Sequence, residues 1–258
     1  MVSAGRAQQL TLFLTNRKCV TLLRMDQEIL RNDIVLFMPQ LRLGSVAPDF
    51  EAQTTHGRIR FHEWSRNAWA VLFSPPDDFT PVCTTELAEM ARRSAEFEKR
   101  GVKVIGLSAN DITSHARWVK DIHALAGTEV TFPIIGDPER KIATQYDMLD
   151  ALDPSNVDAN GLPLTVRDVF VIDPHHIIRL KISYPASTGR NFDEILRVID
   201  SLQLGDQHSI TTPANWRSGD RVIIHPSVQD EEAKARFPDY ETVFPYLRLA
   251  KDPTSEGC

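Results

Sequence analysis

The sequence predicts an α/β domain over residues 41–205, in which a mixed sheet is flanked by helices. Two observations indicate this fold class. Short apolar runs typical of buried strands alternate with longer amphipathic segments typical of helices. Near the end of this region two strand-like segments follow each other directly, which adds an antiparallel hairpin to the sheet. The composition fits a folded protein, with 42% hydrophobic and 25% charged residues among 258.

The first strand-to-helix unit begins with WAVLF, residues 69–73, a continuous apolar run that predicts a buried strand. Residues 84–100 then predict a helix, which Gly101 is placed to end. The helix is amphipathic because five residues fall on one face, namely Leu87, Met90, Ala91, Ser94 and Phe97.

The remaining elements follow the same alternation. VKVIGLS, residues 102–108, predicts the next strand, and Asp111 is a candidate cap for a helix over 112–126. The rest are a short strand and turn (132–137), a helix that opens with proline (138–148), paired strands (167–173 and 176–182) and an amphipathic helix stopped near Gly205 (191–204).

The character of the chain changes after Gly205. Prolines recur at short intervals between short apolar runs such as RVIIHP. We interpret residues 206–258 as a small appended domain, whose apolar side chains need a surface to cover.

The N-terminal residues 1–40 form an extension before the domain. Residues 1–25 contain four basic residues and no acidic one, together with serine, threonine and leucine. That composition is typical of a mitochondrial presequence, and a disordered basic tail is the alternative.

Several function classes are disfavoured by composition. A net charge of −6 gives no general reason to expect nucleic-acid binding, and no apolar run approaches the roughly 18 residues of a membrane span. The three cysteines are far apart and form no CxxC motif, so we expect no zinc site and a reducing compartment. The histidines show no ligand spacing, so we expect no metal and no bound cofactor.

One cysteine stands where a helix should begin, in FTPVCTTE, residues 79–86. In the first helical turn, unpaired backbone N–H groups and the helix dipole would favour a thiolate at Cys83, and the thiolate is the nucleophile. Thr80, three residues earlier, can face the same pocket and bond an oxygen atom. A lone cysteine is otherwise most often a small buried apolar residue.

These residues carry a resemblance to a known family. Pro76, Thr80 and Cys83 form PxxxTxxC, and the longer run PxDFTPVCTTE resembles the peroxiredoxin signature. The resemblance extends over about residues 41–250 and includes a C-terminal stretch, TPANWRSGDRVIIHPSVQDEEAKARF, similar to the one-cysteine, peroxiredoxin 6 branch. Fungal mitochondrial members look closest.

The resemblance implies a thioredoxin-like fold and roles for individual residues. Cys83 matches the peroxidatic cysteine, Thr80 the active-site threonine and Pro76 the proline that shields the pocket. Arg167, in TVRDVFVID, matches the active-site arginine, and Glu86 matches a glutamate that orients arginine.

Three further positions follow from the same resemblance, and a fourth, Cys258, from its place in the sequence. Arg190, in TGRN, matches a second arginine near the pocket, and Val82 is expected to line the peroxide site. Many members of the branch have histidine where this chain has Pro75. Cys258, the last residue, has either no role or the role of trapping the Cys83 sulfenate as a disulfide.

The function implied is that of a thiol peroxidase. Hydrogen peroxide and organic hydroperoxides would oxidise Cys83 to a sulfenic acid, and an external thiol (glutathione, thioredoxin or glutaredoxin) would reduce it. A redox sensor or holdase on the same fold is the alternative. The resemblance also suggests a homodimer in which the C-terminal segment packs across the partner. We expect a location in the mitochondrial matrix, with the cytoplasm as the alternative.

Overall fold

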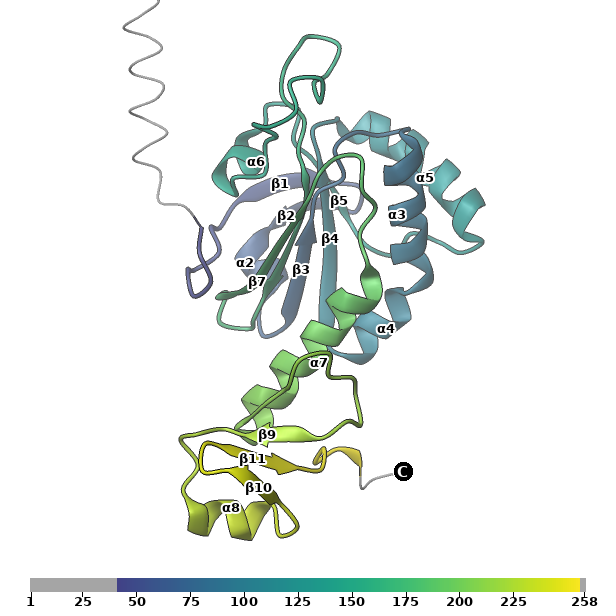
Figure 1. Ribbon diagram of the computed structural model, residues 1–258. Coiled ribbons are helices and arrows are strands. Elements are labelled where there is room, and N and C mark those ends of the chain that lie inside the picture. The colour runs from purple at the N-terminus through teal and green to yellow at the C-terminus, as the bar shows by residue number, and fades with distance from the viewer. Residues whose placement is uncertain (1–40, 256–258) are drawn as a thin grey trace, which may run out of the picture. The chain divides into compact units, whose positions relative to one another are not determined.

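A seven-stranded mixed sheet forms the centre of the computed structural model, which describes residues 41–255 (Figure 1). The predicted fold class is confirmed. The strand order is β2-β1-β5-β4-β3-β6-β7, with β3, β4 and β5 parallel to one another and the other neighbours antiparallel. The strands are β1 (Glu51–Thr54), β2 (Gly57–Arg60), β3 (Trp69–Phe73), β4 (Val102–Ser108), β5 (Ile134–Gly136), β6 (Arg167–Ile172) and β7 (Ile178–Tyr184).

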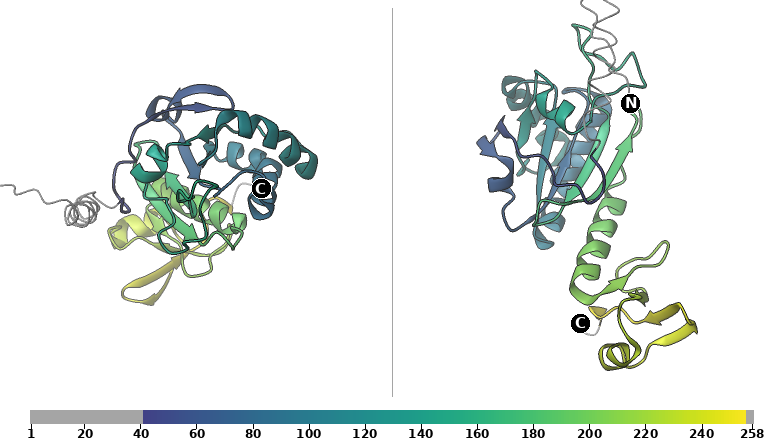
Figure 2. Two further views of the ribbon diagram at one scale, coloured as in Figure 1. Left: turned by 90° about the horizontal axis from the view of Figure 1, so that it is seen from above. Right: turned by 90° about the vertical axis from the view of Figure 1, so that its left-hand side faces the viewer.

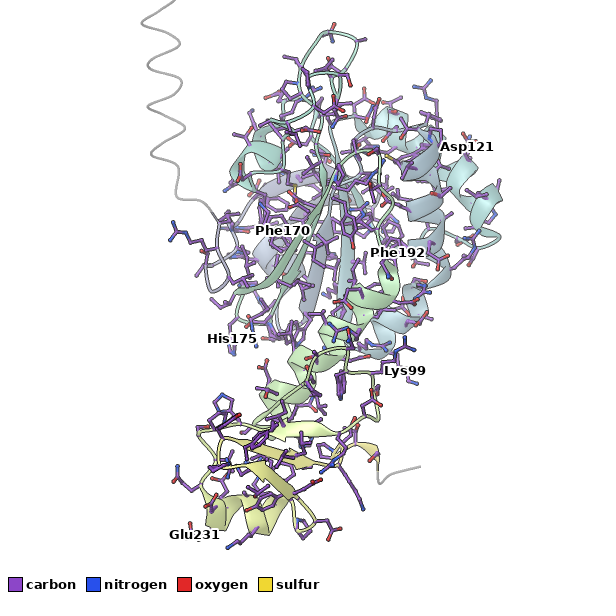
Figure 3. The ribbon with its side chains drawn as sticks, in the orientation of Figure 1. Lys99, Asp121, Phe170, His175, Phe192 and Glu231 are labelled. Carbon is purple, nitrogen blue, oxygen red and sulfur yellow. The ribbon has the colours of Figure 1, made fainter. Side chains whose placement is uncertain are left out.

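The helices cover the two faces of this sheet, as Figure 1 shows. One face packs against α3 (Pro81–Arg92), α4 (Ser94–Lys99), α5 (Ile112–Ala126) and α7 (Phe192–His208). The other face packs against α2 (Phe61–Trp64) and α6 (Lys141–Gln145). Phe192 and Phe170, both labelled in Figure 3, belong to the first and the second of these apolar layers.

The central strands were predicted well because both of their faces are covered. All five side chains of β3 are buried, as are six of the seven in β4. Such strands appear in a sequence as continuous apolar runs rather than alternating ones. The predicted hairpin is also confirmed, since β6 and β7 pair in antiparallel register from Arg167–Tyr184 to Ile172–Ile178.

Three predicted helices have different bounds in the structure. The helix expected over 84–100 begins at Pro81 and is interrupted at Arg93, which has non-helical backbone angles and caps both α3 and α4. The helix expected over 138–148 begins only at Lys141, because Arg140 before it has a left-handed φ of 54°, and the Asp137 carboxylate accepts from Lys141 N and Ala143 N at this later start. The helix expected to stop near Gly205 continues to His208.

The C-terminal segment forms a second, four-stranded antiparallel sheet in the order β10-β11-β9-β8. Its elements are β8 (Ile210–Thr211), β9 (Val222–Ile224), α8 (Asp230–Arg236), β10 (Glu241–Phe244) and β11 (Leu247–Ala250). It has its own apolar cluster, which includes Trp216 and Phe237 and to which Leu204 of α7 also belongs. The helix α7 therefore contributes to both cores (Figure 2).

No helix within residues 41–255 has the length and apolar character that crossing a membrane requires. The predicted presequence, Cys19 and Cys258 lie outside the described residues.

Candidate active site

Cys83 lies in the first turn of α3, as its sequence context predicted. The helix begins at Pro81, preceded by Thr80 in an extended conformation, so that Cys83 is the third helical residue. Proline suits this first position because its backbone lacks the N–H that would have no partner there. The side chain of Cys83 has 0% exposure and packs in the apolar layer between the sheet and α3.

Arg167, the first residue of β6, brings its guanidinium to the sulfur. Its Nη1 lies 3.3 Å from Cys83 Sγ and donates to Glu86 Oε2 at 2.7 Å. The other side of the guanidinium is fixed by Ala186 O, which accepts from Nε at 2.8 Å and from Nη2 at 2.5 Å. A planar group with several donors can hold all three partners at once, which an ammonium cannot.

Glu86 joins this arginine to a second one. Arg190 donates from Nε to Glu86 Oε1 at 2.9 Å and from Nη2 to Oε2 at 2.7 Å, and its backbone N–H also donates to Oε1 at 2.8 Å. All three side chains are at least nine-tenths buried. The guanidinium of Arg190 also lies over the ring of Phe73, 5.0 Å from its centroid.

The cluster places positive charge against the sulfur. Arg167 and Arg190 carry two positive charges, and Glu86 supplies one negative charge. The guanidinium of Arg167 is therefore placed to stabilise negative charge that develops at the sulfur, or at an oxygen bound beside it, during a reaction.

The other predicted site residues surround the same turn. Thr80 donates its hydroxyl to Asp77 O at 2.9 Å, which leaves the lone pairs of its oxygen to accept from a bound molecule. Pro76 is buried, and Pro75 O accepts from Thr165 Oγ1 at 3.2 Å. Val82 is partly exposed at the start of α3.

Two residues that the sequence analysis did not single out also hold the site. Ser74 O accepts from Arg190 Nη1 at 3.2 Å; the N–H of Ser74 donates to Asp168 O, and its Oγ accepts from Asp168 N and donates to Val166 O. Trp118 of α5 donates from Nε1 to Thr84 Oγ1 at 3.0 Å, directly after Cys83. Both contacts join residues far apart in the sequence, so no local pattern could have revealed them.

Of the described residues 41–255, no group of three or more histidine, cysteine, aspartate or glutamate side chains is arranged to hold a metal ion.

Two family models match the chain. Residues 43–181 match the AhpC/TSA family, and residues 201–239 match the C-terminal domain of 1-Cys peroxiredoxin.

Relatives of known identity cover most of the chain. The mitochondrial peroxiredoxin PRX1 of Saccharomyces cerevisiae is 51% identical over 214 residues, 83% of this chain and 82% of the relative. Peroxiredoxin-6 of Gallus gallus is 48% identical over 226 residues, 84% of this chain and 100% of the relative. A solved structure of a yeast mitochondrial 1-Cys peroxiredoxin, described as resolving its thiol via glutathione/thioredoxin systems, superposes with a TM-score of 0.76 at 51% identity, covering 82% of this chain and 100% of that one.

Proposed function

Because this chain belongs to the peroxiredoxin family and is a thiol-dependent peroxidase of the one-cysteine kind, we propose that Cys83 is the residue that reduces the peroxide. The contact between Arg167 Nη1 and Cys83 Sγ at 3.3 Å, inside a buried cluster of two arginines and one glutamate, is the observation that carries this assignment. Catalytic roles for Thr80, Pro76 and Glu86, and peroxide contacts for Val82 and Arg190, belong to the same proposal.

The reaction follows from this geometry. The Cys83 thiolate attacks one oxygen of the peroxide, so that an S–O bond forms while the O–O bond breaks. The leaving oxygen takes up the proton that the thiol lost and departs as water or an alcohol. Arg167 is placed to stabilise negative charge as it moves from sulfur to the leaving oxygen, and Thr80 to accept from the peroxide O–H.

A second thiol completes the cycle. Its thiolate attacks the sulfur of the sulfenic acid, a mixed disulfide forms and water leaves, and another thiol then releases Cys83. Glutathione, thioredoxin and glutaredoxin are the candidates, and we favour glutathione or thioredoxin because the yeast relative is described with those systems. Cys258 as an internal resolving thiol is the alternative, and a Cys83–Cys258 peptide after one equivalent of peroxide would establish it.

The decisive experiment is stopped-flow tryptophan fluorescence of the reduced protein mixed with hydrogen peroxide. Cys83→Ser should abolish the fast second-order phase, and the matched control Cys258→Ser should keep it. A fast phase that persists in Cys83→Ser would disprove the assignment. Repeated turnover with a thiol reductant separates this enzyme from a sensor or holdase, which would be oxidised only once.

We also propose a homodimer, and the C-terminal hairpin supports it. In the β10–β11 hairpin Val243, Phe244 and Tyr246 are 40%, 50% and 80% exposed, and the last two rings are stacked. An exposed apolar patch of this kind favours burial against another chain. Phe244→Asp with Tyr246→Asp should shift sedimentation towards the monomer, whereas unchanged sedimentation would count against this surface.

The division into residues 1–40, 41–205 and 206–258 remains our proposal, with residues 1–40 as a mitochondrial presequence and the matrix as the location. The yeast relative named as mitochondrial supports it. Import of the full chain into isolated mitochondria, with removal of its N-terminal part, is the expected result. A chain that stays outside and uncut would favour the cytoplasm.

A further inference from the structure

A histidine and an aspartate, both with 0% exposed side chains, meet beside the loop that leads to Cys83. Asp78 lies in this loop between β3 and α3, and His115 lies in the first turn of α5. His115 Nδ1 is 2.7 Å from Asp78 Oδ2, and Ser108 Oγ donates to Asp78 Oδ1 at 3.0 Å. His115 Nε2 is 3.1 Å from Ile135 O.

These contacts give both ring nitrogens of His115 a partner. A backbone carbonyl only accepts, so Nε2 of His115 is the donor to Ile135 O. Nδ1 lies against one oxygen of the Asp78 carboxyl, whose other oxygen accepts from Ser108. A satisfied buried pair of this kind rigidifies the segments that carry its two members.

The loop between β3 and α3 depends on such contacts, because one of its residues has a backbone conformation that is unfavourable by itself. Phe79, the residue after Asp78, has a φ of 54°, a left-handed conformation that a side chain with a Cβ disfavours. Asn110 accepts from Asp78 N at 3.1 Å and donates to Asp77 Oδ1 at 2.7 Å. Asp77 O in turn accepts the hydroxyl of Thr80, the residue that caps α3.

The same face of α5 also holds the chain on the other side of the cysteine. Trp118, three residues after His115, is fully buried and donates to Thr84 Oγ1 at 3.0 Å. Thr84 directly follows Cys83. The helix α5 thus fixes the turn at two points, one before and one after the reactive sulfur.

We propose that His115 is a positioning residue for the peroxidase reaction, which acts through Asp78 to hold the loop of residues 77–80 and the start of α3 in place. The inference rests on the proposed role of Cys83.

Loosening this loop should affect the two halves of the catalytic cycle differently. Attack on peroxide needs the sulfur held against Arg167, whereas reduction needs an external thiol to reach a sulfur that has 0% exposure in this arrangement. A loosened loop should therefore slow the first half and not the second.

The test measures the two half-reactions separately in Asp78→Ala, His115→Ala and the double variant. Oxidation of the reduced protein by hydrogen peroxide, followed by tryptophan fluorescence, should be about 10-fold to 100-fold slower in each single variant, since small displacements of reacting groups cost about this much. The double variant should be no slower than the slower single one, because both substitutions remove one interaction. Reduction of the sulfenic acid by glutathione should be as fast as in the parent protein or faster.

Asp78→Asn provides a conservative rescue. Its amide can donate to Nδ1 of a neutral His115 and still accept from Ser108, so oxidation should stay within about threefold of the parent rate. Ile122→Ala serves as the matched control, since Ile122 is also a fully buried residue of α5 but packs in the apolar layer. It should lower stability and leave both half-reactions of the folded protein unchanged.

If a buried alanine prevents folding, His115→Gln gives the same test, because glutamine cannot bond both Asp78 and Ile135 O. Oxidation within twofold of the parent in the folded variants, or slowing of both half-reactions alike, would overturn the inference. So would Asp78→Asn being as slow as Asp78→Ala. A fast phase that survives in Cys83→Ser would instead refute the proposed function.

Discussion

Replacing Arg167 with lysine tests the site most directly, because lysine keeps the positive charge and changes only the geometry. The guanidinium contacts Cys83 Sγ at 3.3 Å, Glu86 Oε2 at 2.7 Å and Ala186 O at 2.8 Å from Nε. A single ammonium cannot reach all three partners, so the donor that faces the leaving oxygen is lost or displaced. Removing one such donor typically slows a reaction by about 10²–10³-fold, or about 2.7–4 kcal/mol. Because the charge remains, we expect about 10²-fold for Arg167→Lys.

The assay is the second-order rate constant for hydrogen peroxide by stopped-flow fluorescence. Iodoacetamide alkylates a thiolate and releases iodide, so its reaction needs no donor to a leaving oxygen. The rate constant for alkylation of Cys83 in Arg167→Lys should therefore fall by less than about tenfold. This comparison separates the loss of transition-state stabilisation from a loss of thiolate. Arg179→Lys is the matched control, since Arg179 of β7 pairs with Asp206 of α7 and with Asp173, outside the site. A peroxide rate for Arg167→Lys within threefold of the parent would refute the assigned role.

Three further outcomes are expected. Glu86→Gln should lower the free energy of unfolding in urea by about 3–5 kcal/mol, because it leaves two buried arginines without their carboxylate; a loss below about 1 kcal/mol would contradict the account of the cluster. Burial raises the pKa of Asp168, whose Oδ2 has no hydrogen-bond partner within residues 41–255. As pH rises, the unfolded chain therefore loses this proton before the folded protein does. The free energy of unfolding then falls with rising pH between the unfolded and the folded pKa. Asp168→Asn removes the cost of ionising this buried carboxyl. The variant should therefore gain free energy of unfolding relative to the parent at pH 7 compared with pH 3.5. A difference between variant and parent that does not change with pH would contradict the raised pKa. Tyr146→Phe should cost about 1–3 kcal/mol, because Tyr146 donates to Pro48 O at 2.6 Å and phenylalanine leaves that carbonyl unpaired; calorimetric melting curves that coincide would show the bond to be unimportant.

The parts of the fold that the sequence predicted well are those decided by burial. Residues 69–73 and 102–108 are continuous apolar runs and form central strands with the predicted bounds. The helix over 112–126 and its Asp111 cap were also predicted correctly, because Asp111 accepts from Ser114 N within the local turn. Burial and capping are local properties of the sequence, so they can be predicted without knowing the fold.

Helix ends that the apolar pattern does not mark were predicted wrongly. At the interruption, Arg93 has non-helical backbone angles and forms ion pairs with Glu89, four residues earlier, and with Asp193, one hundred residues later. The helix α7 continues through Gly205 to His208 and ends at Ser209, which has a left-handed φ of 52°. A glycine inside a helical pattern is therefore not by itself the end of the helix.

The candidate site divides in the same way. The position of Cys83 at a helix start followed from its local context, and the structure bears it out. Arg167 and Arg190 came only from the family resemblance, because an arginine at the start of a strand or just before a helix is usually an ordinary surface charge. The contact of His115 with Asp78 joins residues 37 positions apart, so no local pattern in the sequence predicts it.

The shared carboxylate of Glu86 has a consequence for when the protein becomes reactive during its synthesis. Its arginine partners lie 81 and 104 residues further along the chain. While a ribosome has exposed Cys83 but not yet Arg190, the sulfur has only the surroundings of an ordinary cysteine. With Cys83 as the proposed reactive cysteine, reactivity towards peroxide therefore begins only after β6, β7 and the start of α7 have folded onto the rest. The nascent chain is spared an activated thiol at the stage when it has no stable fold to protect it.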